Sequence, residues 1–235
     1  MDVNFFRCYA RLQAVITQTA LACGRSPTEI RLIGVTKTHP QAVAEQALRA
    51  GLCDLGENKV QEAQAKFTLN GERLPAFAGA RLHFIGSLQS NKALLAVGLF
   101  DVIHSLDRPQ LADKLAQALA QSPRRPQILV QVNSGREPQK AGVAPDGLEA
   151  LLSHSQKIGL TVSGLMCIPP AGLPARSYFE ELAELARRYD LPELSMGMSA
   201  DYKEAIACGA TYIRVGSALF GHRNRMDGLD SDINR

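Results

Sequence analysis

The sequence has no long apolar run, no paired cysteines and no clustered basic face. No stretch approaches the roughly 20 apolar residues of a membrane helix, and the start (MDVNFFRCYARLQAVITQ) does not resemble a signal peptide. The five cysteines lack a CxxC pair, which argues against a structural zinc site. The net charge is only +3, with lysine and arginine spread along the chain, so nothing indicates binding to nucleic acid or to a membrane. We therefore expect a cytoplasmic protein with reduced thiols.

Short runs rich in β-branched residues alternate with helix-period segments from about Ile30 to Phe220. We count eight such units, with strands expected at 30–37, 53–57, 81–85, 101–105, 127–133, 160–168, 193–196 and 212–215. Near-continuous apolar runs are typical of parallel strands that are buried on both faces. Eight consecutive units favour an α/β fold with a single (β/α)8 barrel of the TIM type over an open doubly wound sheet.

The segments outside these units add one helix and no second domain. Residues 3–23 predict an amphipathic N-terminal helix. Its apolar side would carry Phe6, Leu12, Ile16, Ala20 and Leu21. Residues 68–79, which contain Asn70-Gly71, predict a surface loop. Residues 225–235 are polar and predict a flexible tail, so we expect one domain over residues 1–235.

Lys37 is the sharpest candidate for chemistry. Reacting groups in such barrels gather at the carboxyl ends of the strands, and Lys37 ends the apolar run Leu32–Val35. A lysine at the barrel mouth would lie against low-dielectric walls, which favour the neutral, nucleophilic amine. The alternative is that Lys37 only ends a strand and extends to water.

The ends of the last two expected strands suggest a phosphate site. Ser199 precedes a helix start, and Gly216-Ser217 opens a further helical turn. Free backbone N–H groups at such places bind phosphate, and barrels often hold phosphate after strands seven and eight. The alternatives are that Ser199 is only a helix cap and Gly216 only a packing glycine. Barrel closure would bring this site beside Lys37, and the combination suggests pyridoxal 5'-phosphate (PLP).

Arg214 lies within the last expected strand. Alternation places Tyr212, Arg214 and Gly216 on one face, which would be the barrel interior. Arg214 could face the pyridine nitrogen of PLP and, because arginine stays protonated, would leave that nitrogen unprotonated. The alternative is an ion pair with Glu57 or Asp201.

At these residues the chain resembles the pyridoxal phosphate homeostasis proteins, a family of PLP-binding proteins. The matching stretches are GVTKTHP (34–40), GENKVQEAQ (56–64), HFIGSLQSNK (83–92), VNSGREPQKAG (132–142), GLMCI (164–168), LSMGMSADYKEAIACGAT (194–211) and IRVGSALFG (213–221). They cover nearly the whole chain in order.

The resemblance implies a fold like the N-terminal barrel of alanine racemase, with PLP bound covalently to Lys37. It places the phosphate on Ser199, Gly216 and Ser217, and Arg214 near the pyridine nitrogen. It adds Asn58, His83 and Met196 as residues that line the cofactor. Lys140 matches a family lysine implicated in a second, regulatory cofactor interaction. Three positions depart from the family, which commonly has tyrosine at Lys59, lysine at His39 and tryptophan at Leu82, and these departures put secondary cofactor contacts and cofactor transfer in question.

The resemblance implies a carrier or regulator of PLP that supplies PLP-dependent apo-enzymes, and not an enzyme. Racemisation needs an acid and a base on opposite faces of the substrate carbon. In alanine racemase the opposing tyrosine comes from a second domain of the partner subunit, and we expect no such domain here and hence a monomer. Three alternatives stay open: a PLP-dependent racemase or lyase of low activity, a class I aldolase without cofactor, and a regulator that acts through protein contacts. For the regulator, Lys59, His39 and Lys140 do not indicate what kind of protein would bind.

Overall fold

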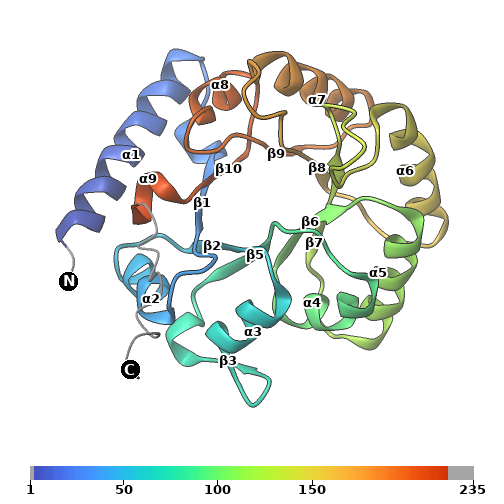
Figure 1. Cartoon of the computed structure of the whole chain (residues 1–235), viewed down its shortest axis with the longest axis horizontal. Coiled ribbons are helices and arrows are strands. Elements are labelled where there is room, and N and C mark those ends of the chain that lie inside the picture. The colour runs from blue at the N-terminus through green and yellow to red at the C-terminus, as the bar shows by residue number, and fades with distance from the viewer. Residues whose placement is uncertain (1–2, 222–235) are drawn as a thin grey trace, which may run out of the picture.

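Eight parallel strands close into a barrel, and helices surround it (Figure 1). The computed structural model describes residues 3–221, so the expected tail at 225–235 lies outside the described residues. The order around the barrel is β1-β10-β9-β8-β7-β6-β5-β2, and β1 pairs with both β2 and β10. The predicted (β/α)8 barrel is confirmed, including the closure that makes the first and last strands neighbours.

All eight expected barrel strands are present, several of them shorter than predicted. They are β1 (Arg31–Val35), β2 (Asp54–Glu57), β5 (Arg81–Phe84), β6 (Val102–Leu106), β7 (Gln127–Val132), β8 (Gly164–Cys167), β9 (Glu193–Ser195) and β10 (Tyr212–Val215). Two corrections concern ends. β1 stops at Val35, two residues before Lys37, and β8 begins at Gly164 because residues 160–163 approach the barrel as a non-strand segment.

The helices form the outer layer. They are α1 (Val3–Ala22), α2 (Gln41–Arg49), α3 (Val60–Phe67), α4 (Ala93–Leu99), α5 (Pro109–Gln121), α6 (Leu148–Lys157), α7 (Arg176–Arg188), α8 (Tyr202–Ala207) and α9 (Ser217–Phe220). The expected extra helix is α1, which packs against α8 and α9. Its buried side carries Phe5, Leu12, Ile16 and Ala20. Phe6 is only half-buried and Leu21 is exposed, so the apolar side was assigned wrongly at these two positions.

The segment at 68–79 is more ordered than the expected loop. Strands β3 (Thr68–Leu69) and β4 (Glu72–Arg73) form a hairpin around Asn70-Gly71. Both turn residues have positive φ, 51° and 86°, which Asn-Gly adopts readily in a two-residue hairpin. After the hairpin, the ring of Phe77 is fully buried with its centroid 4.8 Å from that of Phe67.

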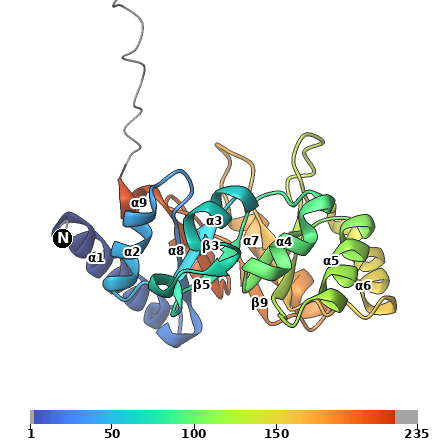
Figure 2. The ribbon, with the colours of Figure 1, turned by 90° about the horizontal axis from the view of Figure 1, so that it is seen from below.

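The barrel interior is closed by polar side chains at the amino ends of the strands. Tyr212 lies in an interior cluster with Ile33, Val102 and Leu129. The Tyr212 hydroxyl accepts a hydrogen bond from Arg31 at 2.8 Å and donates one to the side-chain oxygen of Gln127 at 3.1 Å. The opposite end differs: Figure 2 shows the loops after β7 and β8 rising above the face on which α9 lies. This is the end at which the strands have their carboxyl ends, and it is where a binding site is expected in such a barrel.

Candidate functional site

A cavity of about 770 Å³ opens at the carboxyl ends of the barrel strands. Residues at the ends of β1, β2, β5, β8 and β10 line it, together with the segment between β9 and α8. Six of the eight predicted site residues are among them: Lys37, Asn58, Ser199, Arg214, Gly216 and Ser217. The volume lies in the range typical of small-molecule sites.

Apolar residues that the sequence analysis did not single out form walls of this cavity. They are Val35, Ile85, Ile168 and Met198. Ile85 and Ile168 each come one residue after a strand, in the same alternation as the inward-facing residues of β5 and β8. Alternation carried one position beyond each strand would have found these two.

Lys37 lies in a tight turn after β1, not on the strand itself. The His39 N–H donates to the Thr36 carbonyl at 3.0 Å, which closes the turn around Lys37 and Thr38. Thr38 has a φ of 64°, a left-handed conformation that is uncommon for a β-branched residue. Lys37 is half-buried and lines the cavity.

Two serine hydroxyls from different segments meet beside the cavity. The hydroxyl oxygens of Ser199 and Ser217 are 3.3 Å apart. Ser217 begins α9 as expected, with Gly216 as its N-cap, whereas Ser199 is not the cap of the next helix. Asp201 has that place, and its carboxylate accepts the Met198 N–H at 2.6 Å. Ser199 therefore does not act as a helix cap.

Gly216 is not required by packing within the chain. A methyl group there would meet no protein atom closer than 3.5 Å, an ordinary contact with Val35. Its φ of −118° is also open to residues with side chains. The lack of a side chain at this position leaves room in the cavity, and no close contact within the protein requires it.

Arg214 is buried in the barrel, with neutral hydrogen-bond partners. Its guanidinium donates to the Ser195 hydroxyl at 2.7 Å and to the Cys167 carbonyl at 2.8 Å. Among residues 3–221, no salt bridge joins Arg214 to a carboxylate, so the expected alternative of a pair with Glu57 or Asp201 is wrong. Burial lowers the pKa of the guanidinium, from an ordinary value so high that the group stays protonated. A fixed positive charge thus lines the cavity.

Asn58 contributes an unsatisfied acceptor. Its side-chain oxygen Oδ1 is buried without a hydrogen-bond partner. The Asn58 peptide lies directly against Gly86, where a methyl group would come within 2.1 Å of the Asn58 carbonyl oxygen. Any side chain at position 86 would displace Asn58, so the glycine of the HFIGS motif holds this residue in place.

His83 and Met196 are not among the residues that line this cavity. Met196 is on the outward face of the strand end and packs in the core between barrel and helices. The alternation that places Ser195 against Arg214 puts its neighbour on the other face. His83 faces the interior and is fully buried, and its Nε2 is 2.7 Å from the Asp54 carboxylate at the start of β2.

The remaining residues highlighted by the resemblance are spread around the barrel. His39 lines the cavity, with its ring centroid 5.3 Å from that of Phe220. Lys59 is exposed at the start of α3, and Leu82 is fully buried in the core. Lys140 lies in the loop after β7, where its ammonium pairs with Glu137 at 2.5 Å.

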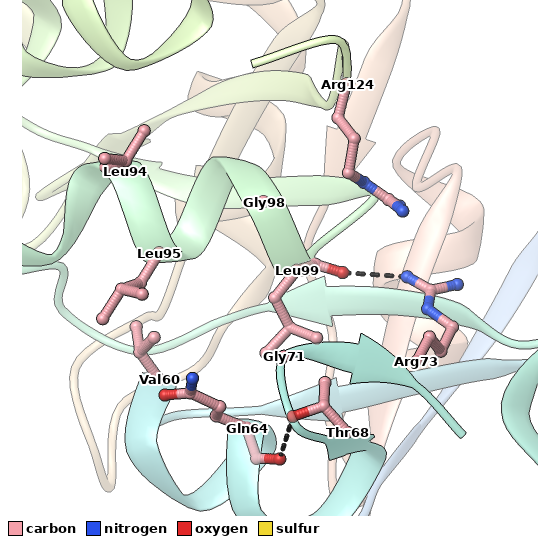
Figure 3. A pocket seen from close by; sticks show the side chains of 10 residues that line it. All are labelled: Val60, Gln64, Thr68, Gly71, Arg73, Leu94, Leu95, Gly98, Leu99 and Arg124. Carbon is pink, nitrogen blue, oxygen red and sulfur yellow. Dashed lines mark hydrogen bonds between the residues drawn. The ribbon is translucent and has the colours of Figure 1, made fainter. Parts of the chain in front are cut away.

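A second, smaller cavity of about 280 Å³ lies outside the barrel, between α3, the β3–β4 hairpin and α4 (Figure 3). Leucines form much of its lining, and the guanidinium groups of Arg73 and Arg124 both bind the Asp101 carboxylate, at 3.0 and 2.5 Å. Their charges are engaged in holding the hairpin.

Residues 3–221 contain no group of three His, Cys, Asp or Glu side chains that could hold a metal ion. None of the described helices is long and apolar enough to cross a membrane.

Known proteins share both the sequence and the fold. A family model described as the N-terminal domain of alanine racemase matches residues 11–224. The pyridoxal phosphate homeostasis protein of Vibrio cholerae is 38% identical over 222 residues, covering 91% of this chain and 94% of the relative. That of Escherichia coli K12 is 37% identical over 225 residues, covering 92% and 95%.

Solved structures agree. PipY of Synechococcus elongatus, solved with PLP bound, has a TM-score of 0.73 and 39% identity, covering 88% of this chain and 100% of PipY. The alanine racemase of Acinetobacter baumannii, at 16% identity, shares the fold with a TM-score of 0.67, covering 96% of this chain and 63% of the racemase.

The barrel and its strand-end cavity therefore define a protein of the alanine racemase N-terminal domain class. Within that class, the chain belongs to the pyridoxal phosphate homeostasis proteins. The family resemblance noted in the sequence is confirmed.

Proposed function

We propose that this protein holds PLP as a Schiff base on Lys37, serves as an intracellular store of the cofactor, and delivers it to PLP-dependent apo-enzymes without catalysing a reaction itself. The observation that carries the proposal is the convergence, in one cavity, of the Lys37 amine, the Ser199–Ser217 hydroxyl pair and the Arg214 guanidinium. The names of the relatives and the PLP-bound structure of PipY support it.

The residues of the cavity fit the chemical groups of PLP. The Ser199 and Ser217 hydroxyls can donate to the phosphate, and the missing side chain of Gly216 leaves room beside them. Arg214 offers a charged donor that its two neutral partners hold in place. The walls of Val35, Ile85 and Ile168 suit the faces of an aromatic ring.

Lys37 forms the covalent bond in this proposal. Its unprotonated Nζ attacks the aldehyde carbon of PLP, a C=N bond replaces the C=O bond, and the aldehyde oxygen leaves as water. Bound PLP supplies an aldehyde for this reversible bond and a ring that can accept electrons when its nitrogen is protonated. Arg214 beside that nitrogen opposes its protonation, because a guanidinium can only donate a hydrogen bond to it and its positive charge disfavours a second cation there.

The lack of an opposing acid–base pair supports storage over catalysis. Among the described residues that line the cavity, Lys37 and His39 have side chains of the types that commonly transfer protons in catalysis. Both belong to one turn, so they approach a bound ligand from the same side. Tyr212, the tyrosine of the last barrel strand, has its hydroxyl bound to Arg31 and Gln127 near the amino ends of the strands.

Absorbance of the purified protein tests the covalent link. Protein loaded with PLP should show a Schiff-base absorbance band near the short-wavelength end of the visible range, and Lys37→Ala should abolish this band. Lys59→Ala is the matched control, because Lys59 is an exposed lysine outside the cavity lining. A Lys37→Ala variant that keeps the band would overturn the assignment of Lys37. A colourless wild type that borohydride traps only with a sugar phosphate would point to an aldolase instead.

The storage role needs a separate measurement. Loaded protein should transfer PLP to a PLP-dependent apo-enzyme, which regains activity over time, while free amino acids remain unchanged. Steady turnover of an amino acid by the pure protein, lost in Lys37→Ala, would replace storage with a racemase or lyase of low activity.

A further inference from the structure

Three charged residues, two of them buried, contact the turn that carries Lys37. Glu57 ends β2, and Lys66 and Glu62 lie one helical turn apart on α3. The Lys66 ammonium is 2.6 Å from the Glu57 carboxylate and 3.4 Å from that of Glu62. The side chains of Lys66 and Glu57 are 6% and 0% exposed. A lysine and a glutamate so completely removed from water need an explanation.

Fold stability does not supply that explanation. Removing two opposite charges from water costs about as much as their attraction returns, and apolar residues of similar size often serve a core at least as well. Burial raises the pKa of the Glu57 carboxyl, while the hydrogen bond and charge of Lys66 act in the opposite direction. One Glu57 oxygen, Oε2, is also buried without a partner. Burying these charges costs free energy, so we look for their role in the neighbouring residues that they hold in place.

Each of the three charged side chains bonds to the Lys37 turn. Lys66 donates to the Thr36 carbonyl at 2.8 Å, and Glu57 accepts from the Thr36 hydroxyl at 2.7 Å. Glu62 accepts from the N–H of Thr38. Lys37 therefore stands between two residues that are both held by side chains outside the cavity lining.

The Glu62 contact also counters a local backbone preference. Thr38 has a φ of 64°, which costs a β-branched residue free energy relative to the ordinary regions. Without an acceptor for its N–H, the turn has reason to relax toward those regions. Relaxation at Thr38 would rotate the peptide next to Lys37 and displace its side chain.

We propose that Lys66, Glu57 and Glu62 are positioning residues that hold the Thr36–Thr38 turn so that the Lys37 amine meets the aldehyde of bound PLP. This inference rests on the proposed Schiff base of Lys37 and extends it to residues outside the cavity lining. Covalent bond formation depends steeply on placement, because a displacement of about 1 Å can cost roughly a hundredfold in rate.

The principal test removes both buried charges together. The Glu57→Gln/Lys66→Met double variant avoids an unpaired buried ion, which would threaten folding. It removes the side-chain donor to the Thr36 carbonyl and leaves the His39 N–H as the donor within the turn. Bound PLP is measured by equilibrium dialysis, and the fraction linked to Lys37 by borohydride reduction and mass spectrometry. We expect PLP to bind still, with the linked fraction clearly reduced and its release to hydroxylamine at least about tenfold faster.

Leu115→Ala in α5 controls for stability alone, because it truncates a fully buried core residue far from the turn. It should lower the melting temperature and leave the linked fraction of the folded protein unchanged. A folded double variant with wild-type linkage and release would overturn the inference while the Schiff base on Lys37 stands. A wild type with no linkage at Lys37 would overturn the proposed function itself.

Glu62 allows a conservative rescue. Glu62→Ala removes the acceptor for the Thr38 N–H, whereas Glu62→Gln keeps an oxygen acceptor without the charge. The alanine variant should release PLP faster than wild type, and the glutamine variant should restore most of the difference. Equal release by both variants would contradict the backbone-holding role of Glu62.

Discussion

Nδ1 of His83 lies 3.0 Å from Nε2 of His104 inside the barrel, and both rings are fully buried. Because Nε2 of His83 faces the Asp54 carboxylate, this nitrogen carries the proton and donates. Nδ1 of a neutral His83 must then accept, so His104 donates from Nε2. The remaining nitrogen, Nδ1 of His104, is left as a bare acceptor, and it has no partner.

This arrangement predicts a loss of stability in mild acid. Burial is the largest cause that lowers the pKa of both rings, and the neighbouring His83 ring and Arg214 guanidinium lower the pKa of His104 further. The unfolded chain therefore binds more protons than the folded one below the ordinary histidine pKa of about 6.5. Stability is present above that pH and is lost as the pH falls, at up to about 1.4 kcal/mol per pH unit for each histidine.

Denaturant unfolding of the protein at pH 7.5, 6.5 and 5.5 measures this loss. His104→Phe keeps a ring beside Tyr212 without a titrating group, so its stability should depend less steeply on pH than that of the wild type. Equal slopes for the two proteins between pH 6.5 and 5.5 would show that His104 is not held neutral.

The serine pair should contribute to affinity only through the phosphate. Ser199→Ala/Ser217→Ala removes two hydroxyls that can donate to a charged group, each worth about 1.5–3 kcal/mol. Dissociation constants for PLP should rise by at least about tenfold. Pyridoxal, which lacks the phosphate, is the matched ligand, and its affinity should hardly change. A similar weakening for both ligands would place the phosphate elsewhere in the cavity.

Periodicity predicted the barrel and part of the site. The near-continuous apolar runs marked all eight strands, and alternation from Tyr212 correctly put Arg214 inside the barrel. The same rule, applied at Ser195, places Met196 on the opposite, outward face. These features depend on local sequence alone, which is why they can be read from it.

Depth and long-range pairing could not be read in this way. His83 faces the barrel interior, but its height along the barrel axis depends on how neighbouring strands are staggered. Lys66 would be expected to reach solvent from α3, and only the docking of this helix on β2 brings it to Glu57. The position of Lys37 beyond its strand, held by such contacts, was unpredictable for the same reason.

Asp101 should matter for stability and not for the cofactor. Its carboxylate accepts from the Leu82 N–H at 2.8 Å and binds Arg73 and Arg124, which ties the β3–β4 hairpin to the barrel. Asp101→Ala leaves two arginines without their acceptor and should cost about 1–3 kcal/mol in unfolding free energy. The fraction of folded protein linked to PLP should equal that of wild type. A changed fraction would show that the second cavity communicates with the first.

Gly216→Ala should change PLP affinity without lowering the stability of the fold. The backbone and the surrounding atoms accept a methyl group here, so the melting temperature should stay the same or rise slightly, as when alanine restricts the unfolded chain. The methyl group would occupy room beside Ser217, and PLP affinity should fall. Gly197→Ala is the contrasting variant: with a φ of 90° and a methyl group 2.5 Å from the Ala205 side chain, it should lower the melting temperature. Thermal unfolding and PLP titration of both variants give the comparison. Unaltered PLP affinity in Gly216→Ala would mean that the phosphate does not approach this glycine, and would leave the two hydroxyls as its main protein contacts.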